Sequence, residues 1–172
     1  SPTLIRCCFR RNAADDDDSD AYGAGMFVEN ANPKLTECLF DRNFTFNWGG
    51  GMSIHGFSSP VLDRCRFIGN FGQYGGGAIW ATLQDIQVLT LRNCIVAGNN
   101  ATGEGGGIYL QGGNAVIRNC TFASNQRYAL VREAWDNTQV LVANCIFRNG
   151  GHEILRYYGN PYVRLWNCDI EG

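Results

Sequence analysis

Only a few residues of this chain are suited to acid–base chemistry, because it contains just two histidines, His55 and His152. Glu29 lies 26 residues before His55, which is one period of the repeat described below. A carboxylate and an imidazole about 5 Å apart on adjacent repeats can serve as acid and base, and the carboxylate raises the histidine pKa. Glu29 and His55 are therefore the candidate catalytic pair. The alternative is an exposed surface pair without a catalytic role, and no face shows the recurring paired carboxylates of a glycosidase.

A run of acidic residues is the candidate metal site. Five carboxylates fall within six positions: Asp15, Asp16, Asp17, Asp18 and Asp20. They repel one another, so the loop is either solvated or neutralised by a hard cation such as Ca²⁺. The distal glutamate of an EF-hand does not follow, nor does the Gly-Gly-x-Gly-x-Asp nonapeptide of calcium-binding β-rolls. Calcium and a flexible acidic loop both stay open, and no other cofactor is required.

Two groups of residues are candidates for binding a glycan or a protein. The first contains loop aromatics, and the second lies near the end of the chain: Phe44, Phe46, Trp48 and Tyr74, then His152, Arg156, Tyr157 and Tyr158. Aromatic rings and arginine suit sugar stacking and protein contacts. The alternative is that these rings simply fold over the core.

Cysteines recur at one repeat position. Seven of the eight are spaced 23 to 31 residues apart: Cys7, Cys38, Cys65, Cys94, Cys120, Cys145 and Cys168. Zinc sites use close pairs such as Cys-x-x-Cys, which the chain lacks. The seven cysteines are predicted to be small, buried core side chains in a ladder, with bridging between neighbouring rungs as the alternative. Cys8 is expected to point outward and to be the most reactive thiol.

The strands and turns that position these residues can be predicted from a repeat in the sequence. Its first motif is aliphatic-x-x-Cys-x-Phe-x-x-Asn, as in LTECLFDRN (35–43), and its second is glycine-rich, as in GGGMSI (49–54). Each period holds three short β-prone runs separated by turn residues, without helical apolar spacing. Periods in the twenties with three strands per turn predict an all-β fold, a right-handed single-stranded parallel β-helix of about seven rungs. It forms a single domain, 1–172, with a loop insert at 13–22 and irregular last rungs at 126–172.

Stacking of the rungs predicts columns of like side chains, since successive coils lie about 4.8 Å apart. One column stacks phenylalanines. Another stacks asparagine amides at a turn, where they bond along the axis and tolerate left-handed backbone: Asn12, Asn43, Asn70, Asn99 and Asn125. In the glycine-rich strands, alternation predicts Ala78 and Trp80 inward and Ile79 outward.

These motifs resemble a known family. The rungs are similar to right-handed parallel β-helix (pectate-lyase-like) repeats. The pairing of Phe-x-x-Asn, as in Phe67-Ile-Gly-Asn70, with Gly76-Gly77-Ala78-Ile79 also resembles the polymorphic outer-membrane-protein repeat of autotransporter passengers. The resemblance covers essentially the whole chain and implies a secreted or surface bacterial protein. Because the motifs encode the scaffold, they specify the fold far more than the function.

Composition and the chain ends narrow the functional classes. With one lysine and a formal charge of −2 there is no basic stripe for nucleic acid, and no apolar stretch long enough to span a bilayer. The chain opens and closes within a repeat, so we expect a segment of a longer protein whose ends meet neighbouring segments of the same or other chains. The leading hypothesis is a non-enzymatic extracellular or cell-surface scaffold, such as a stalk, adhesin or assembly subunit, that presents loops to glycans or proteins. The alternative is part of a polysaccharide lyase or hydrolase, or a carbohydrate-binding module.

Overall fold

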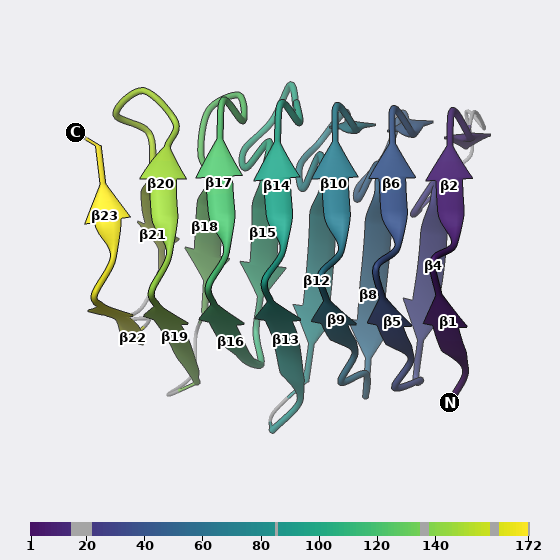
Figure 1. Ribbon diagram of the computed structural model, residues 1–172, viewed down its shortest axis with the longest axis horizontal. Coiled ribbons are helices and arrows are strands. Elements are labelled where there is room, and N and C mark those ends of the chain that lie inside the picture. Colours follow the sequence, from purple (N-terminus) through teal and green to yellow (C-terminus); the bar gives the residue numbers. More distant parts are fainter. Residues whose placement is uncertain (15–21, 85, 135–137, 159–161, 172) are drawn as a thin grey trace.

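The computed structural model is a right-handed parallel β-solenoid, and it describes residues 1–14, 22–84, 86–134, 138–158 and 162–171. Within these residues the chain forms strands and no helix, so none is long and apolar enough to cross a membrane. Each strand pairs in parallel with its equivalent one coil away, as the stacked arrows of Figure 1 show. The predicted all-β solenoid is therefore confirmed.

The strands form three long sheets and one short sheet around a single core. Sheet A contains β1 (Thr3–Ile5), β5 (Lys34–Thr36), β9 (Val61–Asp63), β13 (Val88–Arg92), β16 (Asn114–Arg118), β19 (Gln139–Ala143) and β22 (Tyr162–Trp166). Sheet B contains β2 (Cys8–Arg10), β6 (Leu39–Asp41), β10 (Arg66–Ile68), β14 (Ile95–Ala97), β17 (Thr121–Ala123), β20 (Ile146–Arg148) and β23 (Asp169–Ile170). Sheet C contains β3 (Ala13–Ala14), β7 (Phe44–Thr45) and β11 (Phe71–Gly72). Sheet D contains β4 (Met26–Glu29), β8 (Met52–Gly56), β12 (Ile79–Leu83), β15 (Ile108–Gln111), β18 (Leu130–Glu133) and β21 (Ile154–Tyr157).

The expected number of seven rungs is correct only for sheets A and B. Sheets A and B have seven strands each, whereas sheet D has six. Complete coils are therefore fewer than seven. In Figure 1, sheets A and B form the near side and sheet D lies behind them.

Phenylalanine stacks fill the core beneath sheet B. The rings of Phe9 and Phe40 lie 4.7 Å apart, those of Phe40 and Phe67 4.6 Å, and those of Phe122 and Phe147 4.8 Å, all close to parallel. Val96 occupies the same column between the two stacks, as the register shows. The predicted column and its interruption are both present.

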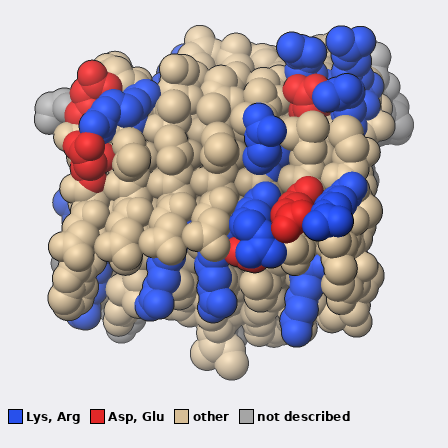
Figure 2. All heavy atoms as spheres, in the orientation of Figure 1, with Lys and Arg blue, Asp and Glu red and all other residues tan. Residues whose placement is uncertain are grey.

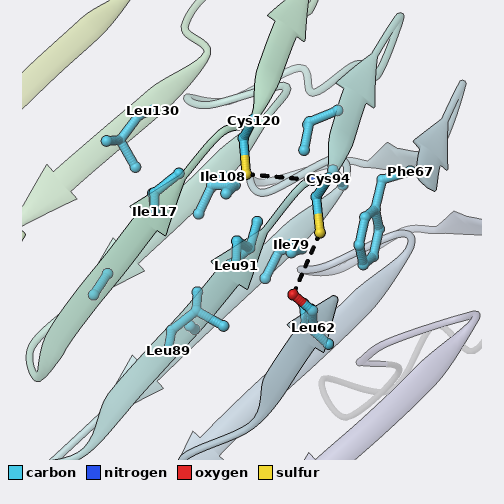
Figure 3. Packing of buried hydrophobic residues seen from close by; sticks show 14 of the residues in the cluster. Leu62, Phe67, Ile79, Leu89, Leu91, Cys94, Ile108, Ile117, Cys120 and Leu130 are labelled. Carbon is cyan, nitrogen blue, oxygen red and sulfur yellow. Dashed lines mark hydrogen bonds between the residues drawn. The ribbon is translucent and has the colours of Figure 1, made fainter. Parts of the chain in front are cut away.

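The cysteine ladder lies at the bend between sheets A and B. All eight cysteines are free, and Cys38, Cys65, Cys94, Cys120 and Cys145 are buried, whereas Cys8 is exposed as predicted. Figure 3 shows Cys94 at the centre of the core, where its thiol donates to the carbonyl of Leu62 at 3.5 Å and its backbone N–H donates to Cys120 Sγ at 3.4 Å. These thiols thus stabilise the stacking of successive coils without any covalent bridge.

The asparagine ladder forms as predicted and extends one rung further. Each amide Nδ2 donates to Oδ1 of the asparagine on the next rung, at 2.9 Å from Asn12 to Asn43 and onward to Asn125. Asn125 continues the ladder to Asn149 at 3.3 Å. Asn149 follows its phenylalanine by two residues instead of three, which hides it from the Phe-x-x-Asn pattern.

Left-handed backbone does not fall on the ladder asparagines, contrary to expectation. It falls one position earlier, for example at Arg42 (φ 52°) before Asn43 and at Gly69 (φ 63°) before Asn70. A second set of left-handed residues precedes the ladder cysteines, with φ between 47° and 55°: Arg6, Glu37, Arg64, Asn93, Asn119, Asn144 and Asn167. These residues turn the chain and let the next side chain point into the core.

Sheet D corrects the predicted alternation at one rung. Ile79 pairs with Met52 and Trp80 pairs with Ser53, so Ile79 points inward and Trp80 points outward. The reason lies in the turn glycine. Gly49 and Gly76 both have positive φ (72° and 59°), and each precedes the first inward residue of its strand by three positions. If the two Gly-Gly-Gly runs are aligned from their first glycines, Gly49 is paired with Gly75 instead of Gly76. This error shifts β12 by one residue, so its inward and outward side chains are exchanged.

Charged side chains on sheets A and B pair between neighbouring rungs. Glu37 accepts from Arg6 at 2.8 Å and from Arg64 at 3.2 Å, and Arg10 bonds Asp41 at 2.8 Å. Figure 2 shows this near side of the molecule, where acidic and basic side chains lie side by side. Exposed pairs of this kind are screened by solvent, so they support the stacking only modestly.

Candidate functional site

The outer face of sheet D carries two columns of functional side chains. The first column, nearer the glycine turns, consists of Phe27, Ser53, Trp80, Tyr109, Val131 and Leu155. The second column consists of Glu29, His55, Thr82, Gln111, Glu133 and Tyr157. Because parallel strands are stacked in register, each residue lies one coil away from its neighbour in the column.

An aromatic cluster covers the first column, and Trp80 is at its centre. Tyr22 stacks on Trp80 at 5.6 Å and Trp48 stacks on it at 5.2 Å, measured between ring centroids. Trp48 also contacts Tyr74 and Tyr109, each at 5.7 Å. Trp80 and Tyr109 are consequently buried, and Trp48 and Tyr74 reach the cluster from the loops that precede β8 and β12.

Beside this cluster lies a cavity of about 370 Å³, which we call the aromatic pocket. Its lining combines five aromatic side chains with two carboxylates and one glycine: Trp48, Tyr74, Tyr109, Tyr157, Tyr158, Glu104, Glu133 and Gly103. Its surface is about evenly polar and apolar, so it offers both stacking faces and hydrogen-bonding groups to a small ligand.

Hydrogen bonds fix the two carboxylates of the aromatic pocket. The Tyr109 hydroxyl donates a short hydrogen bond to Oε2 of Glu133, and the Tyr157 hydroxyl donates to Oε1 of Glu104 at 3.3 Å. Arg127 Nη1 lies 3.8 Å from the same Oε1 of Glu104. The other oxygen, Oε2 of Glu104, is buried and has no hydrogen-bond partner among the described residues.

The electrostatics of the pocket keep Tyr109 and Tyr157 neutral. Burial, together with the hydrogen bond and negative charge of Glu133, raises the pKa of Tyr109 well above its usual range. Burial and the charge of Glu104 raise the pKa of Tyr157. Both hydroxyls therefore stay protonated at neutral pH and act as donors to the carboxylates.

The predicted pair Glu29 and His55 lies at the other end of the second column. The two residues are register neighbours on β4 and β8 and, within the described part of the chain, form no hydrogen bond or ion pair with each other. His55 Nε2 instead lies 2.8 Å from the hydroxyl of buried Ser53, and its ring packs against Trp80 at 4.7 Å. Burial lowers the His55 pKa and the charge of Glu29 only partly offsets this, so the imidazole is neutral at neutral pH.

A second cleft, of about 520 Å³, lies at the Glu29–His55 end and is lined by polar side chains that include Thr82, Gln84 and Gln111. Among the described residues that line it, Glu29 and His55 are the ionisable ones. The pair is thus adjacent to a cleft, but the nearest partner of the imidazole is a buried serine rather than the carboxylate.

The predicted ligand-binding residues separate into two sets. Trp48, Tyr74, Tyr157 and Tyr158 line the aromatic pocket. The other four do not line it. Phe44 stacks on Phe71 at 5.1 Å and meets Phe46 edge-on at 4.8 Å, beside sheet C. His152 contacts Tyr128 at 5.6 Å, and Arg156 pairs with Arg132 in the inward register of sheet D.

Four residues of this face escaped the sequence analysis: Trp80, Tyr109, Glu104 and Glu133. Trp80 was assigned inward because of the one-residue shift at Ala78. Tyr109 lies in the outward column, but an outward tyrosine on a strand does not by itself mark a binding site. Glu104 and Glu133 belong to different parts of the repeat, a loop and a strand, so no common position relates them. The signal that could have revealed them is their relation to the outward Tyr109. Glu104 lies in the loop before the strand of Tyr109, and Glu133 lies on the neighbouring strand of the sheet.

The predicted calcium loop, Asp15, Asp16, Asp17, Asp18 and Asp20, lies outside the described residues. Among the residues that the structure does describe, no group of three or more His, Cys, Asp or Glu side chains could hold a metal ion. Calcium binding therefore stays a prediction from the sequence.

Comparisons with known proteins place this geometry in a family. The chain is 26% identical over 148 residues to metabotropic glutamate receptor-like protein R of Dictyostelium discoideum, a match that spans 84% of this chain and 9% of the relative. No solved structure matches the chain. The family model described as right-handed beta helix region matches residues 44–172. Together with the stacked parallel coils, this match shows that the chain belongs to the right-handed β-helix family.

Proposed function

We propose that this chain is a non-enzymatic β-helical scaffold segment of an extracellular or cell-surface protein, and that its aromatic pocket binds a glycan. The observation that carries the proposal is the pocket itself, in which five aromatic rings and two fixed carboxylates line one 370 Å³ cavity.

The chemistry of the pocket suits a sugar ring. The apolar face of a pyranose packs on tryptophan and tyrosine rings, and its hydroxyl groups donate to carboxylates. Trp48 and Tyr74 supply partly exposed rings, while Glu104 and Glu133 supply acceptor carboxylates. Neutral Tyr109 and Tyr157 hold the carboxylates in place, so little ordering is needed when a ligand binds.

The location at the cell surface is supported by the relative. That protein is named as receptor-like, and the chain matches 9% of its length. A β-helix segment within a much longer surface protein would act as a rigid spacer that holds the pocket at a fixed distance from its neighbours.

Titration calorimetry of the isolated chain against pectin, alginate, glycosaminoglycans, chito-oligosaccharides and neutral glucans tests the proposal. We expect at least one glycan to bind, and Trp48→Ala to weaken binding at least tenfold, about 1.4 kcal/mol, since the ring on which the sugar stacks is lost. Phe46→Ala is the matched control, because Phe46 is a loop aromatic that does not line the pocket. The proposal fails if no glycan binds, or if both variants weaken binding equally.

A second candidate function is favoured by one observation, the presence of Glu104 and Glu133 in a single cavity. Paired carboxylates beside a bound sugar are the machinery of glycoside hydrolases. The same panel should then yield new reducing ends, and Glu133→Gln should abolish them. Binding without turnover supports the scaffold function, whereas turnover that is lost in this variant establishes the enzyme.

A further inference from the structure

The aromatic pocket carries an excess of negative charge. Among the described residues, its lining holds two carboxylates, Glu104 and Glu133, and no lysine or arginine. Arg127 is about half exposed and lies 3.8 Å from Oε1 of Glu104, outside the lining. One partly solvated cation against two carboxylates leaves the pocket attractive to a positively charged group.

One acceptor in the pocket has no donor. Two of the four lining tyrosines already donate to the carboxylates, Tyr109 to Glu133 and Tyr157 to Oε1 of Glu104. Oε2 of Glu104 is buried without a hydrogen-bond partner among the described residues. The hydrogen bonding of this carboxylate is therefore incomplete, so a charged donor beside it is favoured.

The walls of the pocket favour a cation as well. Trp48 lies 5.7 Å from both Tyr74 and Tyr109, and Tyr157 lies 5.7 Å from Tyr158, so ring faces and edges surround the carboxylates. The negative face of each ring attracts an ammonium group within about 6 Å of its centre. Rings and carboxylates thus select the same sign of charge.

From these three features we propose that the aromatic pocket recognises a protonated primary amine on a sugar, that is, an amino-sugar unit of a glycan that is not N-acetylated. The ammonium group lies beside the carboxylates of Glu104 and Glu133, to which its N–H groups donate, and its charge lies among the rings of Trp48, Tyr74 and Tyr109. This inference rests on the proposed glycan-binding function and names its ligand class. A quaternary ammonium group is disfavoured, because it offers no N–H to the carboxylates.

The test compares β-1,4-linked glucosamine tetramer with its fully N-acetylated counterpart by titration calorimetry on the whole chain at pH 6. An amine with a pKa near that of an α-amino group, about 7.7–8.0, is protonated at this pH. We expect the glucosamine tetramer to bind at least tenfold more tightly than the acetylated tetramer. Choline, the third ligand, should bind at least tenfold more weakly than glucosamine tetramer.

The carboxylate is tested by Glu104→Gln, which keeps the side-chain shape but replaces one oxygen by a donor amide and removes the charge. We expect affinity for the glucosamine tetramer to fall at least tenfold in this variant. Glu37→Gln is the matched control, since it removes one negative charge from the opposite side of the solenoid, where Glu37 pairs with Arg6 and Arg64. A thermal melt of each variant checks that the fold is kept.

The outcomes separate this inference from the function on which it rests. If the acetylated tetramer or another glycan binds as tightly as the glucosamine tetramer, and Trp48→Ala abolishes that binding, the pocket binds glycans but the amine specificity is overturned. Equal losses in Glu104→Gln and Glu37→Gln, or choline binding as tightly as glucosamine, also overturn the amine specificity. If no glycan of either panel binds, both proposals fail.

Discussion

At the residue scale, the ladder asparagines hold the turn that follows sheet B by satisfying polar groups that the core buries. Asn70 is fully buried, and its Nδ2 donates to Phe40 O at 3.0 Å and to Asn99 Oδ1 at 2.9 Å. Its Oδ1 accepts from the backbone N–H and the amide of Asn43, at 3.0 and 2.9 Å. Every hydrogen-bonding direction of this one side chain is thus used between three successive coils.

Removal of one ladder amide should therefore be costly. We expect Asn70→Ala to lower the free energy of unfolding by about 3 kcal/mol or more, because buried donors and acceptors on two neighbouring coils lose their partners. Asn119→Gly is the control, since Asn119 belongs to an exposed column and glycine retains its positive φ of 55°. Urea unfolding measures both variants. Similar losses in the two variants would contradict the assigned role of the ladder.

The cysteines should differ sharply in reactivity. Cys8 is exposed, whereas Cys38, Cys65, Cys94, Cys120 and Cys145 are buried. We expect iodoacetamide at pH 8 to alkylate Cys8 within minutes and to leave these five buried thiols unmodified over hours, because alkylation requires access and a thiolate. Peptide mass spectrometry reads the sites, and the protein unfolded in urea provides full labelling as the control. Early modification of Cys94 would disprove the buried ladder.

Stability should fall at alkaline pH through the same thiols. Hydrogen bonding to the next ladder cysteine, with burial, raises the pKa of Cys94 and of Cys120 to about 12. In the unfolded chain a thiol ionises near pH 8.5, so between about pH 8.5 and 12 the unfolded state loses protons that the folded state keeps. The free energy of unfolding should thus decrease as pH rises through this window. Replacing both cysteines by alanine should flatten the decrease, and an unchanged slope would refute this cause.

At the scale of the element, the register of β12 decides which side chains form the core and which form the site. Ile79 is fully buried between Met52 and Ile108, and Thr82 lies in the outward column beside His55. We expect Ile79→Ala to cost about 2–5 kcal/mol and Thr82→Ala less than about 1 kcal/mol in urea unfolding. If Thr82→Ala were the more destabilising variant, the alternation predicted from the sequence, with Ile79 pointing outward, would be supported.

The same strand shows how far sequence could predict this fold. The columns of phenylalanine, cysteine and asparagine could be predicted, since a residue type that recurs once per repeat occupies the same position in each coil. Ala78 breaks this rule, because it occupies the place of the last turn glycine before the strand, and only the left-handed φ of Gly76 reveals the shift. Asn149 was missed for a similar reason, a one-residue change in spacing that the amide ladder tolerates.

At the scale of the whole molecule, the aromatic pocket draws on loops and strands of several successive coils. Trp48 and Tyr74 precede β8 and β12, Glu104 precedes β15, and Glu133 and Tyr157 end β18 and β21. The aromatic half of the site could be predicted from residue type, because rings in stacked loops tend to meet. The carboxylates could not, since their meeting depends on loop lengths and on the corrected register of sheet D.

The most direct test of glycan binding in this pocket uses the indole N–H signals of the chain in an NMR titration with the glycans of the binding panel. Trp48 lines the aromatic pocket, whereas Trp166 is 71% exposed on sheet A. Each signal is assigned by a Trp→Phe variant. We predict that a bound glycan shifts the Trp48 signal in a saturable way and leaves the Trp166 signal unchanged. A shift of Trp166 without Trp48, or no shift with any glycan, would contradict the account.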